Sequence, residues 1–299
     1  MKFKTYEESR LKDLGELVKE VVKDWPQDPW YPTMEQLKDT YAGNEDFTPE
    51  TRHFLYDDDG KLVAFLSSAV EQEEDGIQWG SIHIPFIRKG YEKVESKLFD
   101  KTMGLLKERG VKKVRTYSRP DHGYIPELLK KWGFEKVEEV ERGKRTVLSS
   151  SKLADKKYEA PEYIKELDLN KDEHLAKFKK VYMKARPEVE EENFDSTMQI
   201  FRDRDLTISC VILKKDKVLS YGLLYKADEP NRSFLSSIPV FDEEQPGVMK
   251  EILDYMVNKA HKEGYEEIYH ALVDEEREEL YKKMGIEFTP SFRYELKLD

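Results

Sequence analysis

The chain has 299 residues, of which 38% are hydrophobic and 38% charged, and its net charge is −11. This hydrophobic share is enough for packed cores, and the length fits one large domain or two of ordinary size. The negative charge disfavours a general nucleic-acid binder, which needs clustered Lys and Arg, and it suits a cationic partner such as an amine. No stretch reaches the roughly 18 apolar residues of a membrane span, and the first residues lack a secretion signal, so we expect a cytoplasmic protein without membrane contact.

The first half of the sequence predicts a unit of strands and helices. Apolar spacing predicts helices over 10–23 and 34–41, and the Asp59-Gly60-Lys61 stretch predicts a hairpin turn between apolar strands. A strand that ends at Pro85 follows, then a polar loop and a helix that ends at Gly110. The half closes with a strand over 111–115, a short helix before Gly133 and a hairpin.

The second half repeats these parts in the same order. Pro239 follows Pro85 by 154 residues (239 − 85), and Gly264 follows Gly110 by the same number (264 − 110). Helices expected over 172–184 and 194–203 match the first pair. The fold class is therefore α/β (α+β), with two tandem domains over 1–148 and 158–299, a polar linker over 149–157, and in each a mixed sheet covered by helices on both faces.

The single cysteine excludes a disulfide framework. Cys210 lies in an apolar run, where a buried strand position is favoured over a reactive thiol. The six histidines show no metal-ligand spacing, and we expect no metal.

The order of a proline-ended strand, a loop, a long helix, a strand and a short helix ending in Leu-Tyr-Lys-Lys-Met-Gly-Ile resembles the GCN5-related N-acetyltransferase (GNAT) fold, and it does so in both halves. In that family the sheet is mostly antiparallel, and the strand before the loop splays from its neighbour to admit the pantetheine arm of acetyl-CoA. The loop wraps the pyrophosphate with N–H groups at the start of the next helix. The resemblance implies an acetyltransferase with acetyl-CoA as co-substrate.

The two loops differ in charge. In the first half, Arg88, Lys89 and Lys93 would attract a pyrophosphate, whereas the second loop carries three consecutive acids over 242–244 that would repel it. We therefore expect the acyl-CoA site in the first domain, although an ordinary solvated turn is the alternative. The resemblance assigns coenzyme contacts there to Ile84, Phe86, Ile87, Arg88, Lys89, Gly90, Tyr91 and Lys93.

The catalytic signals favour the other half. In the family a tyrosine four residues before the closing glycine protonates the departing thiolate. Tyr281 occupies that position in the second half, whereas Leu129 occupies it in the first half. A packed structural tyrosine is the alternative for Tyr281. Tyr124 or Tyr117 is the alternative donor in the first half. His83 and His122 are the candidate bases, because the pKa of histidine lies near neutrality.

These observations predict an N-acyltransferase in which a primary amine attacks an acyl thioester directly. The acyl group is acetyl or longer, the acceptor is a small-molecule or peptide amine, and the protein is a monomer or homodimer. Acidic runs over 71–75 and 188–192 would steer a cationic acceptor or form solvated faces. The alternative function is a non-catalytic acyl-CoA sensor or interaction module.

Overall fold

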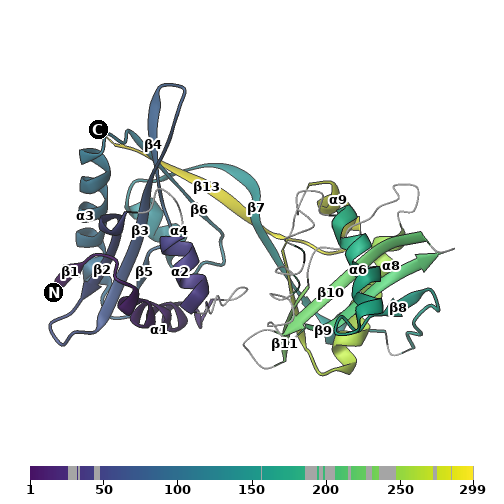
Figure 1. The fold of residues 1–299 in the computed structure, drawn as a ribbon. Helices are drawn as coiled ribbons and strands as arrows, with labels where there is room; N and C mark the ends of the chain where they lie inside the picture. The colour runs from purple at the N-terminus through teal and green to yellow at the C-terminus, as the bar shows by residue number, and fades with distance from the viewer. Residues whose placement is uncertain are drawn as a thin grey trace. The chain divides into compact units, whose positions relative to one another are not determined.

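A computed structural model describes residues 1–25, 32, 34–43, 48–155, 157–185, 194, 198, 206–214, 217–226, 231–235, 247–271, 275–283 and 285–298. The chain forms two compact units (Figure 1). The first comprises Met1–Lys144 and Thr289–Asp299, and the second comprises Arg145–Phe288. This division differs from the predicted one at the C-terminal segment and at the expected linker. In the part of the chain described here, no helix has the length and apolar character needed to span a membrane.

The first unit is a twisted sheet with helices on both faces. Its strands lie in the order β1-β2-β3-β4-β6-β13-β7, with β4 parallel to β6. The helices predicted over 10–23 and 34–41 are confirmed, and Gly110 has the expected left-handed φ of 83°. The elements are β1 (Lys2–Lys4), α1 (Leu11–Val22), α2 (Met34–Ala42), β2 (Arg52–Tyr56), β3 (Leu62–Glu74), β4 (Ile77–Ile82), β5 (Phe86–Ile87), α3 (Glu95–Glu108), β6 (Lys113–Ser118), α4 (Ile125–Lys131), β7 (Glu135–Ser149, up to Lys144) and β13 (Thr289–Lys297).

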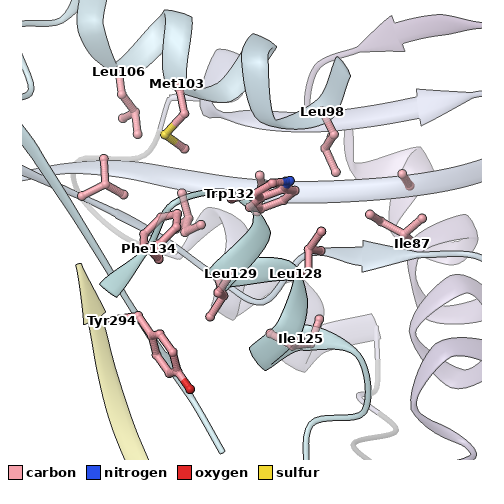
Figure 2. Close-up of a cluster of buried hydrophobic side chains, with 14 of the residues drawn as sticks. Ile87, Leu98, Met103, Leu106, Ile125, Leu128, Leu129, Trp132, Phe134 and Tyr294 are labelled. Atoms are coloured by element: carbon pink, nitrogen blue, oxygen red, sulfur yellow. The ribbon is translucent and has the colours of Figure 1, made fainter. Parts of the chain in front are cut away.

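Two apolar clusters sandwich this sheet. On one face, α3 contributes Leu98 and Leu106 and α4 contributes Leu128 and Leu129 to a buried cluster, as Figure 2 shows. On the other face, α1 and α2 cover a second cluster that includes Phe65. Because successive strand residues point to opposite faces, the single strand β3 contributes side chains to both clusters.

The second unit has the same plan. Its strand order is β7-β12-β11-β10-β9-β8, with β11 parallel to β12. The predicted helix over 172–184 is confirmed, whereas most of 194–203 and the acidic loop over 242–244 lie outside the described residues. The elements are the end of β7, α5 (Ser150–Leu153), β8 (Ile164–Glu166), α6 (Asp172–Ala185), β9 (Leu206–Lys214), β10 (Lys217–Lys226), β11 (Arg232–Leu235), α8 (Gly247–Lys262), β12 (Glu267–Ala271) and α9 (Glu275–Lys283).

Each unit receives a strand from across the expected boundary. The C-terminal strand β13 pairs with β6 of the first unit, with Phe292 opposite Ser118, and the end of β7 pairs with β12 of the second unit. The closing hairpins predicted for the two halves are therefore wrong. The expected linker over 149–157 is also wrong, because Ser150 is buried and α5 packs on α8. An alternating strand pattern specifies a buried face but not which neighbour the strand pairs with, so the sequence could not reveal this exchange.

Candidate active site

In the first unit, the pairing of β4 with β6 stops partway along both strands. The described pairs join Trp79–Ser81 to Lys113–Arg115, whereas β6 continues to Ser118. The chain after β4 instead stays on β3, where Phe86 lies opposite Phe65 and the His83 N–H donates to the Ser67 carbonyl at 2.9 Å. Two neighbouring parallel strands thus separate at this end, as the resemblance predicts.

The loop after β5 leads directly into a helix start. The Arg88 N–H donates to the Val63 carbonyl at 2.9 Å, and Gly90 has a φ of 88°, which favours glycine. A 3-10 turn over Glu92–Val94 then precedes α3. The Gly90 N–H donates to the Glu92 carboxylate at 2.8 Å. The backbone N–H groups of Gly90 and of Glu92 itself both donate to this carboxylate, and they lower the pKa of Glu92.

The Arg88 side chain lies beneath this loop. Its guanidinium is buried, forms an ion pair with Glu20 of α1, and donates from Nε to the Leu62 carbonyl at 3.2 Å. Burial lowers the pKa of Arg88. The sequence predicted that the charge of Arg88 would bind a pyrophosphate. In the structure Glu20 compensates that charge, and the Arg88 side chain instead ties the loop to α1 and to the Leu62 carbonyl. Lys89 and Lys93 remain exposed on it.

Tyr124 reaches the separated strand edge from the start of α4. Its hydroxyl accepts the Ile87 N–H at 2.7 Å and donates to the Pro85 carbonyl at 3.1 Å. Burial raises the pKa of Tyr124, so that the hydroxyl keeps its proton at neutral pH. The side chain nevertheless leaves 37% of the residue exposed, because only the hydroxyl end is enclosed. On the loop itself, Tyr91 donates to Asp57 at 2.8 Å.

The two candidate histidines have different environments. His122 is buried, and its Nδ1 lies 3.3 Å from the Arg119 N–H and 3.3 Å from the Ser118 Oγ. Because the backbone N–H can only donate, Nδ1 carries no proton and the neutral ring is protonated at Nε2. Trp25 stacks on this ring, with centroids 5.1 Å apart. His83 is exposed, with its ring 5.7 Å from that of Tyr41.

The remaining predicted coenzyme residues mostly build the edge. Phe86 and Ile87 are buried in the two clusters, and the half-buried Ile84 packs against both of them. The structure thus brings the residues over 84–91 to one strand edge and places Tyr124 on it. His122 belongs to the adjoining loop before α4.

In the second unit, Tyr281 forms a buried pair that the sequence reasoning missed. Its hydroxyl lies 2.6 Å from Nε2 of His270, and Nδ1 of His270 lies 3.2 Å from the Leu235 carbonyl. Because a carbonyl only accepts, Nδ1 carries the proton, and in the neutral ring Nε2 accepts the Tyr281 hydroxyl. The signal was present in the repeat: an offset of 154 residues places His270 at Thr116 (270 − 154), so the first unit has no equivalent pair.

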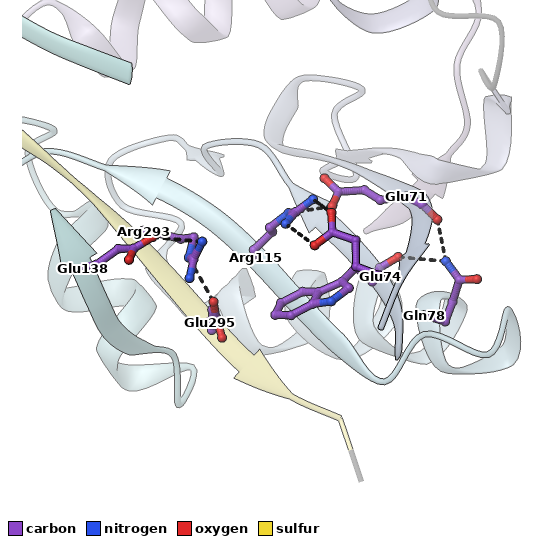
Figure 3. Close-up of polar contacts among 8 residues, drawn as sticks. Glu71, Glu74, Gln78, Arg115, Glu138, Arg293 and Glu295 are labelled. Atoms are coloured by element: carbon purple, nitrogen blue, oxygen red, sulfur yellow. Dashed lines mark hydrogen bonds and ion pairs between the residues drawn. The ribbon is translucent and has the colours of Figure 1, made fainter. Parts of the chain in front are cut away.

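The acidic run over 71–75 is partly neutralised in the structure. Glu71 and Glu74 pair with Arg115 at 2.6 and 2.7 Å, as Figure 3 shows. In the same view, Arg293 pairs with Glu138 and Glu295, each at 2.9 Å. Compensated carboxylates attract a distant cation weakly, so this run gives little support to steering.

Two sequence predictions concern Cys210 and metal binding. Cys210 is buried on β9, as predicted, and burial raises the pKa of its thiol to about 12. Within the described ranges, no three His, Cys, Asp or Glu side chains are grouped so that they could hold a metal ion.

The repeated plan, the parallel strands that separate and the loop before α3 define the class of fold: two units of GNAT fold in tandem. No family model and no curated sequence matches the chain. Among solved structures, it is similar to a tandem GNAT protein from the clavulanic acid biosynthesis pathway, with 12% identity, 99% and 98% of the two chains covered and a TM-score of 0.62.

Two further structures support the same fold. A GCN5-related N-acetyltransferase from Sphaerobacter thermophilus has 13% identity and a TM-score of 0.60, with 99% of this chain and 95% of that chain covered. A GNAT-family acetyltransferase from Colwellia psychrerythraea has 16% identity and a TM-score of 0.61, with both chains fully covered. At these identities the likeness establishes the fold.

Proposed function

We propose that the chain is an N-acyltransferase that moves an acyl group from acyl-CoA to a primary amine, and that the first unit holds the acyl-CoA. The observation that carries the proposal is the strand edge over 84–87, which leaves β6 and runs into a loop at a helix start. Such an edge offers N–H and C=O groups to an extended amide chain, and the helix start offers N–H groups to a pyrophosphate.

The reaction follows from this placement. The amine nitrogen attacks the thioester carbon, the C–S bond breaks, and the sulfur receives a proton while the amine loses one. Backbone N–H groups of the edge would polarise the carbonyl. Tyr124 is the proton donor we propose in the first unit, because its hydroxyl stays protonated and lies on that edge. His122 is the candidate base: its Nδ1 is unprotonated and would have to release the Arg119 N–H to take up the proton that the amine loses.

Acetyl-CoA is the donor we propose to test first. The tandem GNAT protein of the clavulanic acid biosynthesis pathway, to which the chain is similar, was solved in a form without acetyl-CoA. A more distant likeness, at 11% identity and a TM-score of 0.50, is to the Saccharomyces cerevisiae N-myristoyltransferase with bound myristoyl-CoA. A longer acyl chain is therefore the second donor. The net charge of −11 favours a cationic amine as acceptor.

A second function is a non-catalytic acyl-CoA sensor. It is favoured by Leu129, which occupies the position of the family's proton donor in the first unit and is fully buried. In the second unit the hydroxyl of Tyr281 is also buried and directed at His270. A sensor needs the coenzyme edge but no proton donor.

Calorimetric titration of the full chain with acetyl-CoA tests both proposals, followed by release of free coenzyme A thiol across a panel of primary amines. Binding with turnover supports the transferase, and binding without turnover supports the sensor. If neither acetyl-CoA nor myristoyl-CoA binds, both are refuted. Ile87→Pro removes the N–H of the edge and should weaken binding, whereas Val137→Ala, on an exposed side chain of β7, serves as the control.

A further inference from the structure

Two backbone donors of the proposed coenzyme site already have side-chain partners from the first unit. The Ile87 N–H donates to the Tyr124 hydroxyl at 2.7 Å, and that hydroxyl donates to the Pro85 carbonyl. Three residues further on, the Gly90 N–H donates to the Glu92 carboxylate at 2.8 Å. One partner is a neutral hydroxyl at the strand edge, and the other is an anion at the helix start.

The Tyr124 contact lies on the side of β5 that faces away from β3. The Arg88 N–H is used for pairing with Val63 on β3, and donors alternate along a strand, so the Ile87 N–H points to the opposite side. An amide chain that extends the sheet at this edge requires this N–H together with the Pro85 carbonyl. The Tyr124 hydroxyl accepts the Ile87 N–H and donates to the Pro85 carbonyl, which are the two hydrogen bonds that an amide group of a ligand would make.

The Glu92 carboxylate takes the place that a bound anion would have at the loop N–H groups. The lowered pKa of Glu92 shows that the loop N–H groups stabilise a negative charge at this position. A pyrophosphate placed on the same N–H groups would meet a carboxylate of like charge. Glu92 therefore has to turn away before the loop can bind a phosphate.

We propose that the first unit is self-occupied at rest: Tyr124 and Glu92 stand in for the pantetheine amide and the pyrophosphate, and acyl-CoA binds after displacing both. This inference rests on the proposed function, since it concerns the regulation of that same site. When only a fraction of molecules has an open site, the apparent affinity falls by that fraction. Any ligand or partner that withdraws Tyr124 would raise the affinity for acyl-CoA.

The surroundings allow both side chains to move without unfolding the loop. Tyr124 is 37% exposed and follows Gly123, whose φ of 53° marks a turn. Glu92 is exposed on a 3-10 turn. By contrast, Arg88 is buried on Glu20 and Leu62, so the loop backbone keeps its place when the two side chains leave.

Calorimetry with acetyl-CoA on the full chain tests this inference. Tyr124→Phe keeps the ring but removes the hydrogen bonds that hold it, and Glu92→Gln removes the charge. Tyr124→Phe should tighten binding by about fivefold, as expected for the loss of one competing hydrogen bond. Glu92→Gln should tighten it by a similar factor for another reason: the amide can still accept the Gly90 N–H, but it no longer repels the pyrophosphate. The matched controls are Tyr56→Phe, which removes a hydroxyl bond of 2.8 Å to Asp13, and Glu108→Gln at the far end of α3; both should leave binding unchanged.

A second probe separates the two contacts. ADP carries a pyrophosphate but no pantetheine arm, so Glu92→Gln should tighten ADP binding while Tyr124→Phe should not. If acetyl-CoA binds to the native chain and Tyr124→Phe binds it equally or more weakly, self-occupation is refuted while the proposed function stands. If the native chain and the double variant both fail to bind any acyl-CoA, the proposed function fails as well. Thermal unfolding of each variant confirms that it is folded.

Discussion

Deletion of residues 289–299 should unfold the first unit and leave the second folded. These residues carry β13, which lies 150 or more residues from most of the unit it completes. β13 pairs antiparallel with β6 from Phe292 to Lys297, and the Leu298 N–H donates to the Lys112 carbonyl at 2.8 Å. Its removal exposes one side of β6, the strand from which the edge over 84–87 separates.

The size of the effect follows from what β13 contributes. Its six register pairs with β6 correspond to about six hydrogen bonds, each worth about 1 kcal/mol net. The buried side chains of Tyr294 and Leu298 add about 2 kcal/mol each. The total, on the order of 10 kcal/mol, is comparable to the whole free energy of unfolding of an ordinary domain. The truncated first unit therefore has no stability left.

Hydrogen exchange measured along the chain checks this prediction. In the truncated protein, amides of β4 and β6 should lose their protection, while those of β10 and α8 keep it. A synthetic peptide of residues 289–299 should restore protection of β6. Persistent protection of β6 after truncation would contradict the strand exchange. For a milder test, Leu298→Ala should cost about 2–4 kcal/mol, whereas Lys297→Ala, on an exposed side chain, should cost little.

Three further predictions concern single residues. His53 is buried on β2, and burial lowers its pKa from 6.5 to about 4. Between these pH values the unfolded chain binds a proton at His53 and the folded chain does not, so His53 should lower the stability by up to about 3 kcal/mol; in denaturant titrations the fall should be smaller by that amount in His53→Leu. Gly123→Ala should destabilise by more than about 1 kcal/mol, because φ is 53° and the new Cβ would lie 2.6 Å from Trp25, whereas Gly104→Ala in α3, which meets nothing within 4 Å, should stabilise by about 0.5–1 kcal/mol. The thiol of Cys210, with its pKa near 12, should not react with a disulfide reagent until the protein is unfolded; rapid native labelling would contradict its burial.

The sequence predicted the local elements of the fold well because their signals are local. The helices ending at Gly110 and Gly264 stop at glycines with φ of 83° and 86°, and the apolar residues of α8 are buried. The repeat offset of 154 residues also located the proline-ended strand and its loop, and the resemblance to the GNAT fold implied that this strand separates from its neighbour. These features depend on spacing along a single segment, which the sequence displays directly.

The features that were missed depend on pairing between distant segments. The strand exchange joins β13 to β6 across more than 170 residues, and an alternating pattern does not name its partner. The charge of Arg88 is visible in the sequence, but its compensation by Glu20 of α1 is not. The repeat offset shows in the sequence that His270 replaces a threonine of the first half, but its contact with Tyr281 depends on how β12 and α9 pack, which the sequence does not show.

The candidate proton donors in the two units, Tyr281 and Tyr124, differ in the hydrogen bond that each would have to break in order to act. A hydroxyl donates one hydrogen, and in Tyr281 that hydrogen is directed at Nε2 of His270 within a fully buried pair. To protonate a thiolate, Tyr281 would have to leave His270 without its partner, at a cost of about 1–3 kcal/mol. Tyr124 donates to the Pro85 carbonyl at 3.1 Å, a longer contact at a strand edge, and its side chain is partly exposed. Tyr124 therefore breaks a weaker hydrogen bond when it turns toward a ligand, which makes it the better candidate for protonating the thiolate in the first unit.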